Sequence, residues 1–215
     1  MNAESLSGLL DLSGTTHTNA GTYSDSWSFA GNGNYNAASG SVTDKIAKAT
    51  ALIVVAPYDV TFDGAAHTAT GSATGVNSES LSGLDLSGTT HTNAGTYSTD
   101  AWSFSNANYA DQSGTVTDKI KKASSSLTVT CPVSRTYTGD PIEPCTASYA
   151  GAGGLSGSLT PSYSSNVNVG TAMASASYLG DANHEPSSNV ATFQIAQAAA
   201  TVSVAAYSVT YDGSA

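Results

Sequence analysis

Two cysteines, Cys131 and Cys145, are the only ones in the 215-residue sequence, and a disulfide is the chemistry that we expect of them. Their midpoint is Thr138, next to Gly139, so a turn there would place both thiols opposite each other on adjacent strands. Closing a loop of about fifteen residues would add roughly 3 kcal/mol of stability and implies an oxidising compartment. One alternative is two buried free thiols. The other is a zinc site, which is less favoured because the cysteine spacing is not that of a zinc knuckle and no pair of histidines lies nearby.

The four histidines are the next candidates for chemistry. His17 and His91 occupy matching positions in two similar segments, whereas His67 and His184 stand elsewhere. A catalytic or metal role needs converging partners, and the sequence places only Thr, Asn and Gly beside them. We expect loop residues with local hydrogen bonds. Since no nucleophile–base pair, phosphate loop or carboxylate pair recurs with usable spacing, we expect no catalytic residue and no enzyme.

Acidic residues occur next to glycine in three turn-like segments, at Asp63, Asp181 and Asp212. Calcium takes six to eight oxygen ligands, and the sequence contains no D-x-D-x-D-G loop. Asp and Gly are also what tight turns require. We therefore expect turns and no cofactor, with calcium bound by the acidic turns as the alternative.

Aromatic residues offer a possible ligand surface. Trp27, Trp102 and Tyr97 are candidate ligand contacts, because such rings can stack on a sugar. Each Trp also alternates with Ser and shares its face of a strand with a Phe two residues later, which favours an anchor in the core.

Asp44 and Asp118 fall on the apolar phase of a strand-like segment, where a carboxylate is costly unless it is paired. We expect a bulge or an edge position that leaves them exposed to water. An acid-assisted Lys–Asn cross-link is the alternative, but Lys45 and Lys119 must point to the opposite face from their neighbours.

These residues belong to a repeated unit. Residues 17–29 read HTNAGTYSDSWSF, residues 91–104 read HTNAGTYSTDAWSF, and a degenerate copy spans residues 166–183. The period is about 74 residues. It divides the chain into the later part of a repeat (1–49), two whole repeats (50–123 and 124–198, the second with the disulfide), and the first strands of another (199–215).

Short polar–apolar alternations rich in Val, Ile, Thr and Tyr are separated by Gly, Asn and Asp, and no stretch has helical periodicity. The pattern predicts an all-β chain of small antiparallel sandwiches with about six or seven strands each. No Pro/Ser-rich linker separates the repeats, so we expect them to stand end to end as a rod.

The segments at residues 211–213 (Tyr-Asp-Gly), 93–97 (Asn-Ala-Gly-Thr-Tyr), 180–184 (Gly-Asp-Ala-Asn-His) and 120–123 (Ile-Lys-Lys-Ala) together resemble bacterial immunoglobulin-like repeats of the MBG/YDG kind. The resemblance covers essentially the whole chain and implies immunoglobulin-like sandwiches from large secreted or cell-surface, adhesin-like proteins. It supplies no catalytic residues. The sequence departs from the pattern at His184, where Tyr is usual, and at Asp118, where the next repeat has Phe193.

Sixteen acidic residues against six basic ones give a net charge of −10, which disfavours nucleic acid and anionic membranes as partners. No segment approaches the length of an apolar membrane span. We expect a structural or adhesive stalk or spacer of a bacterial extracellular surface protein, in contact with neighbouring repeats or other copies of the chain. The alternative is a β-sandwich module that binds a glycan or a host-surface protein.

The repeat boundaries suggest a mode of assembly. Residues 199–215 match residues 50–66, so the tail of one molecule could complete the repeat at residues 1–49 of the next, except for about nine residues. Such strand donation would build head-to-tail filaments. The alternative is a sequence cut from a longer array, in which case residues 1–49 should be the least ordered part.

Overall fold

The computed structural model describes residues 5–213, so the first four and last two residues of the predicted end segments lie outside it. Within residues 5–213 the regular elements are strands and four short 3-10 turns, which confirms the all-β prediction. It divides into two compact units. Of the described residues, 5–61 and 65–121 form unit 1, and 62–64 and 122–213 form unit 2.

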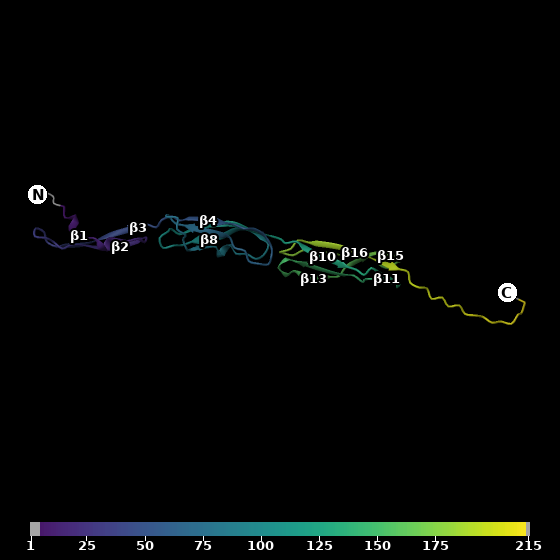
Figure 1. Ribbon diagram of the computed structural model, residues 1–215. Coiled ribbons are helices and arrows are strands. Elements are labelled where there is room, and N and C mark those ends of the chain that lie inside the picture. Colours follow the sequence, from purple (N-terminus) through teal and green to yellow (C-terminus); the bar gives the residue numbers. More distant parts are fainter. Residues whose placement is uncertain (1–4, 214–215) are drawn as a thin grey trace. The chain divides into compact units, whose positions relative to one another are not determined.

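Unit 1 begins with a three-stranded antiparallel sheet in the order β1–β2–β3. The long strands β2 and β3 lie side by side (Figure 1) and pair Gly21 with Ile46 at one end and Phe29 with Ala38 at the other. The bounds are η1 (Ser7–Leu9), β1 (Leu10–Asp11), η2 (Ser13–Thr15), β2 (Gly21–Phe29) and β3 (Ala38–Ile46).

The remainder of unit 1 contains two sheets, β4–β6 and β5–β9–β8–β7. Ala51, Ala73 and Phe104 form the buried centre between them together with Tyr109. The bounds are β4 (Leu52–Ala56), β5 (Asp59–Thr61), β6 (Thr70–Thr74), β7 (Leu84–Asp85), η3 (Ser87–Thr89), β8 (Gly95–Phe104) and β9 (Gln112–Lys121).

Unit 2 repeats this sandwich-like plan with sheets β10–β12–β13 and β11–β16–β15–β14. Apolar side chains from both sheets, including Leu127, Ala147, Ala172 and Phe193, form one core cluster. The bounds are β10 (Ser125–Thr130), β11 (Ser134–Thr136), β12 (Thr146–Gly151), η4 (Ala152–Gly154), β13 (Ser156–Leu159), β14 (Ser162–Ser164), β15 (Gly170–Tyr178) and β16 (Ser187–Ala196).

Strand direction departs from the prediction in one respect. β5 pairs with β9 in parallel, and β11 pairs with β16 in parallel, whereas the alternating pattern had led us to expect antiparallel pairing throughout. The physical reason is that the chain leaves one sheet after β4 or β10 and joins the opposite sheet without reversing. Period-2 alternation reports which face a side chain occupies, but not which neighbour the strand pairs with.

Candidate functional site

The residues that could do chemistry gather on the inner face of the β2–β3 and β8–β9 pairs. On β8, Tyr97, Asp100 and Trp102 point inward, and the residues between them are exposed. The second copy of the repeated segment has one residue more than the first, and the register of β8 against β9 shifts between Tyr97 and Asp100 to accommodate it. The bulge keeps Asp100 on the inner face.

A histidine and an aspartate form the centre of the site in both copies. His91 Nε2 lies 2.9 Å from the Asp100 carboxylate, and its ring stacks on Tyr97 with centroids 3.5 Å apart. His17 lies 2.8 Å from Asp25 and stacks on Tyr23 in the same way. Our sequence-based expectation of local hydrogen bonds left out these aspartates. The recurring spacing of His and Asp, eight residues in one copy and nine in the other, was the available signal.

Asp118 completes the cluster in residues 50–121. Its side chain is fully buried, and its Oδ1 accepts a 2.9 Å hydrogen bond from the backbone N–H of Tyr58. Its Oδ2 is buried without a hydrogen-bond partner. Burial raises the pKa of Asp118, and the close approach of the Asp100 carboxyl group, through hydrogen bonding and charge, raises it further.

The prediction that Asp118 would be exposed at a bulge or an edge is therefore wrong. The bulge of this sheet lies on β8 instead. β5 pairs with β9 from Lys119 onward, directly after Asp118. Asp118 therefore lies on a strand that has β8 on one side and β5 on the other. Asp44, at the matching position of β3, is only half-buried.

Tyr58 covers the cluster from the segment between β4 and β5. Its hydroxyl donates a 3.2 Å hydrogen bond to the carbonyl of Thr89. Burial, together with the negative charges of Asp118 and Asp100, raises the pKa of Tyr58 to about 12. The Tyr58 hydroxyl is therefore a proton donor at physiological pH, and the cluster holds two carboxyl groups, one imidazole and a neutral phenol.

Unit 2 replaces this polar cluster by apolar side chains. Ala172 and Phe193 pair across β15 and β16 as Tyr97 and Asp118 pair across β8 and β9, and Ala174 lies at the position of Asp100. All three are buried. Two sandwiches of one plan are thus stabilised differently, and the polar cluster is not needed to form the fold.

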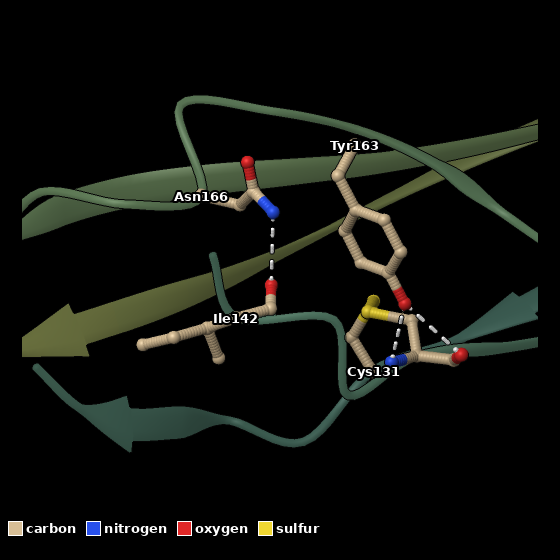
Figure 2. Close-up of a disulfide and its surroundings, with 5 residues drawn as sticks. Cys131, Ile142, Tyr163 and Asn166 are labelled. Atoms are coloured by element: carbon tan, nitrogen blue, oxygen red, sulfur yellow. Dashed lines mark hydrogen bonds between the residues drawn. A yellow bond between two sulfur atoms is a disulfide. The ribbon is translucent and has the colours of Figure 1, made fainter. Parts of the chain in front are cut away.

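Unit 2 has the disulfide instead. Cys131 and Cys145 are bonded, as predicted, and they continue the β10–β12 register by one pair beyond Thr130 and Thr146. The intervening segment is not a simple turn, because it contains β11, which joins the other sheet. Figure 2 shows the Tyr163 hydroxyl beside the disulfide, where it accepts a hydrogen bond from the Cys145 N–H and donates to the Cys145 carbonyl.

The acidic turn of unit 2 is held by its own hydrogen bonds. Asp181 Oδ1 accepts from the backbone N–H groups of Asn183 and His184, both at 2.7 Å. Burial works against its charge, but these bonds and the Tyr178 hydroxyl outweigh it and hold the pKa of Asp181 far below its usual range. Between residues 5 and 213, no group of three or more His, Cys, Asp or Glu side chains is arranged to hold a metal ion.

The aromatic candidates lie on inner faces and are partly buried. Trp102 packs against the core cluster of unit 1 and covers Gly114, where an added Cβ would lie 2.6 Å from the indole ring. The Tyr97 hydroxyl donates to the Asn93 carbonyl. Trp27 covers Gly40 in the same way and borders an open hollow of about 640 Å³ whose other lining residues include Asp11, Ser39 and Ser41.

Comparison with known proteins gives no family and no relative: no family model matches the chain, and a search of curated proteins finds no match. The described part of the chain contains no helix long and apolar enough to cross a membrane.

Proposed function

We propose that this chain is a non-catalytic structural or adhesive segment, a stalk or spacer of a bacterial extracellular surface protein. It would be built from immunoglobulin-like tandem repeats standing end to end as a rod. The observation that carries the proposal is the repetition of one strand plan. In the segment from β4 to β9, the first strand pair is divided between two sheets: β4 lies in one sheet, and β5 lies in the other, parallel to β9. In the segment from β10 to β16, β10 and β11 are divided in the same way, and β11 is parallel to β16.

The short connection between the repeats supports stiffness. β9 ends at Lys121 and β10 begins at Ser125, so only three residues separate them. Ala123, the middle one, exchanges backbone hydrogen bonds with the turn at residues 183–185 of unit 2. A connection this short is what the proposed stiff end-to-end array would need.

The chemistry of the buried groups supports a role without catalysis. The His91 ring stacks on Tyr97 and is hydrogen-bonded to Asp100. The disulfide of unit 2 suits an extracellular location. A net charge of −10 disfavours binding of such a segment to anionic membranes.

Small-angle X-ray scattering tests the rod. A strand of ten residues is about 33 Å long, so three repeats end to end predict a largest dimension of at least about 100 Å and the cross-section of one sandwich. Inserting a further copy of residues 50–123 after residue 123 should lengthen the particle by one repeat at constant cross-section. A particle that thickens instead would contradict the proposal.

A glycan-binding module is the second candidate, because Trp27 borders a hollow lined by serines and an aspartate. An aromatic ring beside hydroxyl and carboxylate groups is suited to stack on a sugar and bond its hydroxyls. A glycan array would test this, with Trp27→Ala as the variant that abolishes binding and Trp102→Ala as its matched control. No bound glycan, or equal binding by both variants, would reject this candidate.

A further inference from the structure

The turn at residues 105–109 lies within unit 1, where the repeat at residues 1–49 meets the repeat at residues 50–123. Asn106 Oδ1 accepts a 3.0 Å hydrogen bond from the backbone N–H of Asn108, and this bond closes the turn. The matching turns of the first repeat and of unit 2 are closed by the same bond, within the pairs Asn32 with Asn34 and Asp181 with Asn183. The conformation of the turn is therefore set by its own residues.

The backbone of this turn holds the chain at the point where the first repeat ends. Ala49 donates its N–H to the carbonyl of Asn108 at 2.9 Å, and the Ala49 carbonyl accepts from the N–H of Ala110 at 2.7 Å. The same pairing recurs in unit 2, between Ala123 and residues 183–185. The connection is thus one point of attachment between the two repeats, and a single point would leave the first repeat free to swing about it.

The side chain of Asn108 provides a second point of attachment, at the start of β2. Its Oδ1 accepts a 2.8 Å hydrogen bond from the backbone N–H of Ala20, which lies 88 residues earlier in the sequence. Its Nδ2 donates to Oδ1 of Asn19 at 3.1 Å. Ala20 directly precedes Gly21, which pairs with Ile46 at one end of the β2–β3 hairpin. Both strands of this hairpin are therefore tied to one turn of the next repeat.

Apolar side chains leave part of this junction open. A hollow of about 320 Å³ remains there, bordered by Ile46 of the first repeat and by Val76 and Tyr109 of the second. Val76 is 68% exposed. An unfilled space offers few dispersion contacts, so the partly buried bond between Ala20 and Asn108 carries more of the attachment.

Both sides of this contact recur in the sequence. The asparagine of the turn stands at residues 34, 108 and 183. The loop that it binds, Asn19-Ala20-Gly21, recurs as Asn93-Ala94-Gly95 and in altered form as Asn168-Val169-Gly170. Each repeat therefore contains both the residue that accepts and the loop that donates.

We propose that the turn at residues 105–109 is a docking surface for the preceding repeat, and that Asn108 fixes the direction of that repeat. Asn108 recognises the Asn-Ala pair before β2 by accepting from one backbone N–H and donating to one side-chain oxygen. A repeat attached at both strands of its hairpin resists bending, whereas a repeat attached through Ala49 alone does not. The inference rests on the proposed spacer role for its purpose, because it names the contact that makes consecutive repeats stiff.

Hydrogen exchange of the whole chain, followed by NMR, tests the bond itself. The Ala20 amide should be protected in the wild type. Asn108→Leu removes the acceptor and should speed the exchange of this amide about tenfold or more. Asn108→Asp keeps an acceptor oxygen and should preserve the protection. The amides of β8 and β9 should exchange at the same rates in all three chains, which shows that the second repeat is intact.

Distances between two spin labels test the stiffness of the joint. Ser39→Cys and Ser113→Cys place the labels at exposed, matching positions of β3 and β9. The distance distribution should be narrow with Asn108 present and broad in Asn108→Leu. Asn34→Leu is the matched control, because it makes the same change in a matching turn that follows Phe29, at the opposite end of the β2–β3 hairpin from Ala20. It should leave the distribution narrow.

Three results would overturn the proposal: an Ala20 amide that is unprotected in the wild type, a distribution that Asn108→Leu leaves narrow, or equal broadening by Asn34→Leu. The spacer role has a separate test in the length of the particle. An elongated particle with a flexible joint would contradict the role of Asn108 alone, whereas a stiff joint in a particle that thickens would contradict the spacer alone.

Discussion

Replacing Asp118 by Asn should stabilise the sandwich formed by residues 50–121. Asp118 is fully buried, one of its oxygens lacks a partner, and Asp100 lies beside it. An asparagine keeps the acceptor for the Tyr58 N–H and supplies an N–H that can donate to Asp100. Removing an unsatisfied buried group is worth about 1 to 3 kcal/mol, which is the gain that we expect at pH 7.

The pH dependence of this gain follows from the raised pKa of Asp118. Below the pKa of an unfolded aspartate, about 3.9, both states hold the proton and Asp118 adds no pH-dependent penalty. As the pH rises, the unfolded chain releases its proton first, so the wild type loses stability until the pH passes the pKa of the folded state. The advantage of Asp118→Asn should therefore be small near pH 4 and largest at neutral pH.

Urea unfolding followed by tryptophan fluorescence measures this gain. Both tryptophans of the chain lie in unit 1, so a Trp27→Phe background leaves Trp102 as the reporter of residues 50–121. Asp44→Asn is the matched control: its carboxyl is half-buried, and its effect on the Trp102 signal should stay within about 0.5 kcal/mol. A loss of stability in Asp118→Asn at pH 7, or an equal gain at pH 4 and pH 7, would refute the reasoning.

Three further changes test the packing of each unit by the same assay. His91→Ala leaves the buried Asp100 carboxylate without its partner and should destabilise residues 50–121 by about 2 kcal/mol, while His17→Ala should leave the Trp102 transition in place. Gly114→Ala forces a methyl group against the Trp102 ring and should cost about 1 to 3 kcal/mol with a shift of the Trp102 emission; an unshifted spectrum would contradict the packing. Replacing Cys131 and Cys145 by Ala should cost unit 2 about 3 kcal/mol, seen by circular dichroism, with no change in tryptophan fluorescence.

The strand content and the disulfide could be predicted from the sequence because both depend on local signals. Alternation places Phe104 and Ile120 on an inner face, and the midpoint of the cysteines falls near a glycine. The parallel pairing of β5 with β9 could not be predicted, since it depends on which sheet the chain joins after β4. The alternation of polar and apolar residues shows which face of the sheet a side chain occupies, whereas tertiary packing decides which strands pair with each other.

The polar cluster was missed for a related reason. A carboxylate at an inward position suggests an exposed strand when each strand is considered alone. In the structure the Tyr58 N–H binds Asp118, and it comes from a segment sixty residues earlier in the sequence. His91 similarly meets Asp100 only because a bulge in β8 turns that aspartate inward. Contacts of this kind depend on the assembled sheets and have no local signature beyond the repeated His and Asp spacing.

Pulling single molecules by their two ends tests the structural role most directly. A segment of independent sandwiches should extend in discrete steps, one for each whole sandwich. Because the disulfide joins residues fourteen apart, the step of unit 2 should be shorter by about 45 Å, at about 3.6 Å per extended residue. A reductant should restore the missing length. Smooth extension without steps, or steps that a reductant leaves unchanged, would contradict the proposal that this chain is a structural segment built from such units.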